Sequence, residues 1–292
     1  GTAPATHPTI CFYSLFIFIE DENRSKKRHK DDLPPEITAS QNLFLKIKDE
    51  APVNAEEYSN PTNILRLPFP FMGFVKPTDR FAIDDGSFEY MGREEFAQVL
   101  REIENLKGGN GYTELFIFGS IGYGKSHILA AMVCLLLQQG KRVVFLPDCR
   151  AMAKGFPEYL QAALLLTFAD NVYYQKKIYN CMSVNDIHSF CRGLAKEEIR
   201  LYFIVDQLNA LDNDENDNER MTNEKKGRIK VDLESITNNH YYIKSASANW
   251  KSALHVKQKQ MNERKVSLFG GLTESEMRNW WTNYKNYLPK CE

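Results

Sequence analysis

The apolar positions of this chain fall into short runs that alternate with helical patterns. Runs typical of strands occupy residues 115–118, 142–146, 201–205 and 241–246, with a fifth candidate at 266–269. Helical spacing of apolar residues recurs over 96–106 and 127–137, and in several parts of 157–200. Residues 90–96 are expected to open the first of these helices. This alternation predicts an α/β domain with a mostly parallel five-stranded sheet and flanking helices. Ligands of such sheets bind at the carboxyl ends of the strands.

The first part of the chain lacks such a pattern. Residues 20–62 are charged, contain four prolines and keep no period of 2 or 3.6, which is typical of a linker. The apolar, proline-broken segment 67–75 is suited to lying on a domain surface. We therefore predict a partly disordered N-terminal extension or linker at 1–69, followed by one domain at 70–292.

Composition narrows the class of protein. The 292 residues carry a net charge of −1, so overall charge indicates neither a nucleic-acid partner nor a membrane. The six cysteines include no C-x-x-C pair, which argues against a zinc site or a disulfide framework and favours reduced thiols inside a cell. No spacing of the histidines suggests a metal site or a catalytic triad.

Two features near the N-terminus have more than one interpretation. The apolar run 10–19 is shorter than the roughly 20 residues of a membrane-spanning helix, so we expect a buried strand or the remnant of a longer element. The basic run 26–30 is expected to be a solvated linker, with a nuclear-import signal as the alternative. The chain begins with Gly1 and is expected to be a fragment or a processed form.

The strongest chemical signal is the segment 119–126, GSIGYGKS, which fits the phosphate-loop spacing G-x-x-x-x-G-K-[ST]. Its glycines permit positive φ and a close approach of the backbone to a ligand. Lys125 is expected on the β- and γ-phosphates and Ser126 on Mg²⁺. The alternative is a chance glycine-rich turn, although the flanking strand and helix favour the motif. The predicted nucleotide contacts in this segment are Gly119, Ser120, Ile121, Gly122, Tyr123, Gly124, Lys125, Ser126 and His127.

A second signature follows about 80 residues later, where Asp206 ends the strand at 201–205. This carboxylate is expected in the Mg²⁺ shell, with a common turn residue as the alternative. Gln207 comes next and can orient a water but cannot take its proton. After the strand at 241–246, Asn249 is the first choice for a residue that hydrogen-bonds the γ-phosphate or the attacking water, and Ser247 is the second. The alternative is a polar strand end that starts a turn. Lys125, Asp206, Gln207 and Asn249 are thus the predicted catalytic residues.

In this order the pieces resemble the AAA+/STAND branch of phosphate-loop ATPases. Residues 90–94 (YMGRE) match that branch's hydrophobic-hydrophobic-Gly-Arg-Glu motif, which implies that Gly92 and Arg93 lie near the nucleotide base. Gln207 and Asn209 stand where the branch carries acids, so rapid hydrolysis is in doubt. A helical lid would begin at about Thr273, in a capping box, and would be truncated at Glu292.

More narrowly, the chain resembles the NTPase domain of crinkler-type effectors over about residues 70–290. The matching segments are GREEF (92–96), GSIGYGKSHILAA (119–131), VVFLPDCR (143–150) and IVDQLNALD (204–212). This resemblance implies action inside a host cell, often its nucleus, after secretion and delivery. It also implies a toxic or signalling module farther along the chain.

Three functions are therefore open. The first is an ATP- and Mg²⁺-binding nucleotide switch or slow ATPase, whose partners would be nucleotide, a protein or an appended effector module, and other copies of itself. The second is a small-molecule kinase with residues 151–200 as a substrate cap. The third is an interaction scaffold that binds nucleotide without hydrolysing it.

Overall fold

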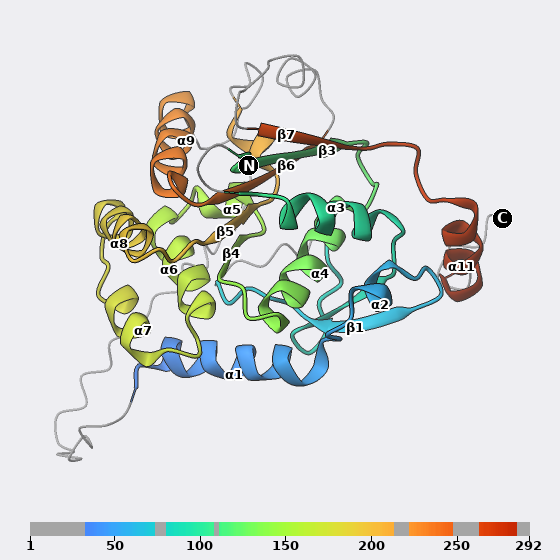
Figure 1. Ribbon diagram of the computed structural model, residues 1–292, viewed down its shortest axis with the longest axis horizontal. Coiled ribbons are helices and arrows are strands. Elements are labelled where there is room, and N and C mark those ends of the chain that lie inside the picture. Colours follow the sequence, from blue (N-terminus) through green and yellow to red (C-terminus); the bar gives the residue numbers. More distant parts are fainter. Residues whose placement is uncertain (1–32, 74–79, 108–110, 213–221, 248–262, 285–292) are drawn as a thin grey trace, which may run out of the picture. The chain divides into compact units, whose positions relative to one another are not determined.

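The computed structural model describes residues 33–73, 80–107, 111–212, 222–247 and 263–284, without the side chain of Ser247. Its centre is a parallel five-stranded sheet in the order β4-β5-β6-β3-β7 (Figure 1). The strands are β3 (Glu114–Gly119), β4 (Val143–Leu146), β5 (Tyr202–Val205), β6 (Tyr241–Ser247) and β7 (Glu263–Leu268). All five predicted strands are present, and the predicted α/β fold with flanking helices is confirmed.

The helix after β3 is the most deeply buried element. In α4 (Lys125–Gln138), every residue from Ile128 to Leu137 is buried. It contacts β4, α1 (Pro35–Glu50), α3 (Glu95–Glu104) and the hairpin of β1 (Ile64–Pro68) and β2 (Ser87–Met91). A helix covered on all sides has no polar face, which explains its unbroken apolar sequence.

The linker prediction for residues 20–62 is wrong over its second half. Residues there form α1 and the short helix α2 (Ala55–Ser59), and α1 packs against α4 and α6 (Phe156–Thr167). The buried positions of α1 are Ile37, Ser40 and Ile47. One of these is polar, and its hydroxyl accepts a hydrogen bond from buried Gln175 at 2.6 Å. A narrow, partly polar buried face hides the helical period in the sequence.

Two other expectations fail around the hairpin. Phe69 and Phe71 lie inside the protein at 1% exposure, rather than on its surface. Tyr90 and Met91 pair with β1 and belong to β2, so the helix that was expected to open at these residues begins at Glu95. Phe69 is buried against the rings of Phe81 and Phe88, and Phe71 against that of Tyr159. At Tyr90 and Met91, pairing with the distant strand β1 overrides the local helical pattern.

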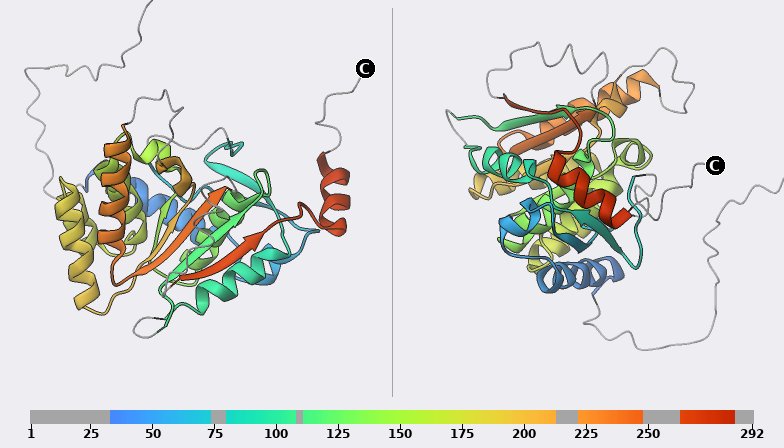
Figure 2. Two further views of the ribbon diagram at one scale, coloured as in Figure 1. Left: turned by 90° about the horizontal axis from the view of Figure 1, so that it is seen from above. Right: turned by 90° about the vertical axis from the view of Figure 1, so that its right-hand side faces the viewer.

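The connections that follow β3, β4 and β5 contain helices, as predicted (Figure 1 and Figure 2). After β4 come α5 (Cys149–Met152), α6, α7 (Val172–Tyr179) and α8 (Val184–Lys196), and β5 leads through the single turn η1 (Leu208–Leu211) to α9 (Asn223–Thr237). The predicted capping box before α11 (Glu274–Tyr284) is confirmed, since Thr273 and Glu276 each accept the other's backbone N–H. Among the helices described, none is long and apolar enough to span a membrane.

A buried histidine makes the fold sensitive to acid. His240 precedes β6 at 2% exposure. Its Nδ1 accepts the Leu201 N–H at 3.2 Å, and its Nε2 lies 3.0 Å from the Cys191 carbonyl. Both contacts fit a neutral ring that donates from Nε2. Burial lowers the pKa of His240 from 6.5 to about 4.

We expect wild-type stability to fall between pH 6.5 and pH 4, because the unfolded chain takes up a proton that folded His240 refuses. The loss from this residue is about 3 kcal/mol. Urea unfolding at several pH values measures it. The variant His240→Asn, whose amide oxygen replaces the Nδ1 acceptor, should give a flatter profile. Parallel profiles for the two proteins would contradict this assignment.

Candidate functional site

The predicted phosphate loop joins β3 to the N-terminus of α4. Gly122 and Gly124 have φ values of 81° and 88°, in a region that residues other than glycine rarely adopt. A Cβ at Gly119 would lie 1.8 Å from the Leu268 carbonyl oxygen of β7, so neighbouring backbone excludes any larger residue. A Cβ at Gly122 would meet nothing within 4 Å. The loop thus has one side packed on the sheet and an open backbone that a ligand can approach.

Lys125 begins α4 and turns back into the loop. Its Nζ donates to the carbonyl oxygens of Gly119 at 3.0 Å and Ser120 at 2.7 Å. Burial lowers the pKa of Lys125, and the charge of Asp206 opposes that change. The ammonium group is therefore held on carbonyl oxygens of its own loop, at the place where phosphate contacts were predicted.

Asp206 follows β5 at the same edge of the sheet and is 2% exposed. Burial raises the pKa of its carboxyl, and the guanidinium of Arg80 is the main opposing influence. Arg80 Nη1 lies 3.0 Å from Asp206 Oδ2 and 3.5 Å from the hydroxyl of Ser126. The tertiary structure thus brings together the two predicted Mg²⁺ ligands, with a cationic side chain between them.

Sequence reasoning missed Arg80. It lies before β2, 46 residues ahead of Ser126, and belongs to no motif. Only the fold places its guanidinium beside the carboxyl ends of β4 and β5. No local signal could have identified it.

Gln207 has an unusual backbone conformation, with φ 58° and ψ 42°. This left-handed conformation costs a residue with a side chain roughly 1–2 kcal/mol. Its N–H donates to Asp206 Oδ1 at 2.9 Å, which ties the bend to the carboxylate. Backbone strain next to a buried acid is common at functional sites. This backbone conformation turns the chain from the end of β5 into η1.

The two candidates for sensing the γ-phosphate are only partly placed. The backbone of Ser247, at the end of β6, pairs with Gly119 at the start of the loop. That register brings the end of β6 beside the phosphate loop. Asn249 lies outside the described residues.

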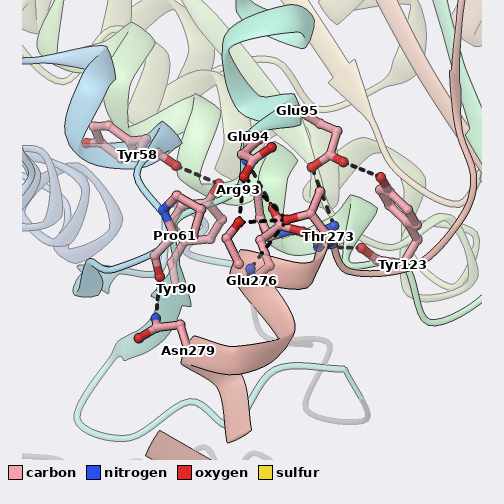
Figure 3. A network of polar contacts seen from close by, with 11 residues as sticks. Tyr58, Pro61, Tyr90, Arg93, Glu94, Glu95, Tyr123, Thr273, Glu276 and Asn279 are labelled. Atoms are coloured by element: carbon pink, nitrogen blue, oxygen red, sulfur yellow. Dashed lines mark hydrogen bonds and ion pairs between the residues drawn. The ribbon is translucent and has the colours of Figure 1, made fainter. Parts of the chain in front are cut away.

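Arg93 connects the loop to the C-terminal helix, as Figure 3 shows. Its Nη1 donates to the Tyr123 carbonyl at 2.6 Å, and its Nε donates to Glu276 Oε1 at 2.9 Å. The guanidinium also lies 4.8 Å from the centroid of the Tyr123 ring. Tyr123 Oη in turn donates to Glu95 Oε1 at 2.5 Å. The Gly-Arg-Glu motif therefore holds the phosphate loop and α11 together, and its contact with a base stays a prediction.

The structure explains why residue 92 is a glycine. A Cβ at this position would lie 2.0 Å from the carbonyl oxygen of Asn60. Since that oxygen belongs to the backbone, the neighbour cannot easily move aside. Glycine is thus required where the chain passes α2 between β2 and α3.

His127 packs among aromatic rings. Its ring centroid lies 4.5 Å from that of Phe81 and 6.1 Å from that of Phe88. Burial, with the nearby charges of Arg80 and Arg93, lowers its pKa to about 4. His127 is therefore neutral at pH 7 and adds no positive charge for a phosphate.

The residues at this edge of the sheet fit a magnesium nucleotide. The open loop with its positive-φ glycines suits the close approach of a phosphate. A hydroxyl (Ser126) and a carboxylate (Asp206) are the oxygen ligands that Mg²⁺ prefers. The guanidinium of Arg80, held between these oxygens, is a stand-in for a cation.

The comparisons with known proteins found one similar curated protein and several similar solved structures. No protein-family model matches the chain. It is 27% identical over 134 residues to the chromosomal replication initiator protein DnaA of Aquifex aeolicus (strain VF5), a match that covers 46% of this chain and 30% of that protein. The chain thus spans under a third of this curated relative's length.

Similar solved structures include a chain of the HORMA:CdnC:Trip13 complex of E. coli MS115-1, with TM-score 0.39, 10% identity and coverage of 82% of this chain and 79% of that one. AMPPCP-bound DnaA from Aquifex aeolicus gives TM-score 0.37, 17% identity and coverage of 75% and 58%. Drosophila ORC bound to GC-rich DNA and Cdc6 gives TM-score 0.39 and 11% identity, with coverage of 95% of this chain and 39% of that one. All three TM-scores lie below 0.5, so the fold assignment rests on the strand order and the loop geometry.

Proposed function

We propose that this chain is an AAA+ P-loop NTPase domain that binds ATP with Mg²⁺ and acts as a nucleotide switch with slow hydrolysis. The observation that carries the proposal is the meeting of the phosphate loop, Lys125, Ser126 and Asp206 at one edge of the sheet. The phosphate loop and the end of β5 at Asp206 lie far apart in the sequence, and each supplies part of this site. Their convergence is the geometry that phosphoryl chemistry needs.

Each residue has a defined task in this proposal. The loop N–H groups and the α4 N-terminus bind phosphate oxygens, and Lys125 leaves its own carbonyl oxygens to bind the β- and γ-phosphates. Ser126 and Asp206 would hold Mg²⁺, which when bound neutralises charge on the phosphates. Gln207 orients a water without taking its proton, so turnover is slow.

The variant Gln207→Glu tests whether the site is built for hydrolysis. We expect ATP turnover to rise about 10- to 100-fold, since a positioned general base contributes about 10²–10⁴. Phosphate release under saturating ATP and Mg²⁺ measures the rate. Gln139→Glu makes the same chemical change at an exposed position after α4 and should leave turnover unchanged.

The outcomes separate the two remaining candidates. Nucleotide binding with a measurable increase in turnover supports the slow ATPase. Nucleotide binding with no hydrolysis in either protein favours the scaffold instead. The kinase alternative gains nothing from the segment 151–200, since α6 packs against β4 and α1 and α8 packs against α6 and α9.

The narrower role of a crinkler-type effector remains a proposal that rests on the four matching sequence segments. Under it, nucleotide binding at the loop would change the presentation of a module beyond this chain, inside a host cell or its nucleus. The link from Arg93 to α11 supports such a switch, because it connects the loop to the last described helix. Partners other than nucleotide, including further copies of the chain, are proposals of the same kind.

A further inference from the structure

Arg80 contacts oxygen atoms at the start of α4 and at the carboxyl ends of β4 and β5. Its Nη1 contacts Asp206 Oδ2 at 3.0 Å and Ser126 Oγ at 3.5 Å. Its Nη2 contacts the Pro147 carbonyl oxygen at 3.0 Å and Asp148 Oδ2 at 3.1 Å. A hydroxyl, a carbonyl and two carboxylates around one positive charge form a donor set suited to a hard cation.

The carboxylates of this set are held in place. Asp148 caps α5, with its Oδ1 accepting the N–H groups of Arg150 and Ala151 at 2.8 and 3.2 Å, which leaves Oδ2 directed at Arg80. Asp206 is buried and bound to the Gln207 N–H. Oxygens that stay in place after Arg80 is removed would still form a cation site.

The position of Arg80 is also constrained. The next residue, Phe81, is 1% exposed and packs against Phe69, Phe88 and His127, with centroid distances of 5.0, 5.4 and 4.5 Å. This packing anchors the backbone on the C-terminal side of Arg80. We therefore expect the guanidinium to leave by a movement of the side chain.

Arg80 and Mg²⁺ cannot use these oxygens together. Mg²⁺ needs oxygen ligands at about 2.0–2.1 Å in near-octahedral geometry, whereas the guanidinium already lies within hydrogen-bond distance of Asp206 and close to Ser126. Two cations at such separations also repel each other. Metal binding at Ser126 and Asp206 therefore requires the guanidinium to leave.

We propose that Arg80 is an internal competitor for the metal site, which closes the site in the nucleotide-free chain and must be displaced when Mg²⁺-nucleotide binds. This inference rests on the proposed function and adds its regulation. The apparent metal affinity is then the intrinsic affinity multiplied by the fraction of chains in which Arg80 has left these oxygens. Any contact that draws Arg80 away would activate the site.

The test uses Mn²⁺ alone, followed by electron paramagnetic resonance, on the full chain without nucleotide. We expect Arg80→Ala to bind Mn²⁺ about 10-fold or more tightly than wild type, within the usual range of coupling between two ligands. Arg66→Ala is the matched control, since Arg66 pairs with Asp84 at 2.9 Å on the surface. It should behave as wild type. Titration at pH 8 favours the ionised form of Asp206, whose pKa burial raises.

The double variant Arg80→Ala with Asp206→Asn locates the site, because it should lose the added affinity. Equal affinities of Arg80→Ala and Arg66→Ala would overturn the proposal, as would a gain that survives Asp206→Asn. If circular dichroism finds Arg80→Ala unfolded, Arg80→Gln takes its place, with the same expectations. ATP binding by wild type is measured separately, so failure of the proposed function would be seen there and not in the Mn²⁺ titration.

Discussion

Replacement of Lys125 by alanine is expected to weaken ATP binding about 100-fold or more. Two charge-assisted contacts to phosphate oxygens would be lost, at about 1.5–3 kcal/mol each. The cost to the fold is small by comparison, since Nζ contacts only backbone carbonyl oxygens of its own loop among the bonds observed. The variant should therefore remain folded while its affinity falls.

Titration with a fluorescent ATP analogue in the presence of Mg²⁺ measures this effect. Lys141→Ala removes the same charge at an exposed position after α4 and should bind as wild type. Circular dichroism of both variants checks the fold. Equal affinity of Lys125→Ala and wild type would refute nucleotide binding at this loop and with it the proposed function.

Replacement of Glu276 by alanine is expected to release α11 from the domain. Glu276 is fully buried and accepts hydrogen bonds from Arg93 Nε at 2.9 Å, Glu94 N at 3.0 Å and Thr273 N at 2.8 Å. Burial raises its pKa, but these donors and the charge of Arg93 together hold the pKa below its ordinary value. Removing one partner of a buried ion pair costs about 3–5 kcal/mol.

Hydrogen exchange of the α11 amides measures the release. A loss of about 3 kcal/mol corresponds to more than 100-fold faster exchange through local opening, with α4 much less affected. Glu274→Ala is the control on the same helix. Within the described part of the chain Glu274 pairs only with exposed Arg278 one turn away, and such pairs contribute about 0.3–0.5 kcal/mol. Equal protection of α11 in both variants would show that Glu276 does not hold the helix.

The second effect of Glu276→Ala concerns the phosphate loop. Arg93 donates both to Glu276 and to the Tyr123 carbonyl, so loss of one partner frees the guanidinium to move. We expect ATP affinity to fall along with α11 protection. A fall in both quantities would show that the phosphate loop and α11 are coupled through Arg93.

The helices and strands differed in how well the sequence predicted them. Strands such as β3 and β5 are buried on both faces, so their apolar runs are unmistakable. The helix α1 has a narrow buried face that includes Ser40, and its position depends on contacts with α4 and α6. Tyr90 and Met91 fit a helix start locally, yet pairing with Ile64 and Leu65 makes them a strand.

The residues at the candidate site also fall into two groups, those within a local sequence motif and those brought together only by tertiary contacts. Lys125 and Ser126, with the loop glycines, could be identified from the sequence because a phosphate loop is continuous, and its spacing is dictated by the turn it must make. Asp206 was found from its place at the end of an apolar run. Arg80 and the pairing of Arg93 with Glu276 join segments 126 and 183 residues apart, and only tertiary packing brings such side chains together. The sequence by itself determined that this protein has a phosphate loop and an acidic partner for it, whereas the tertiary structure alone decided which charges surround that acid and what holds the loop.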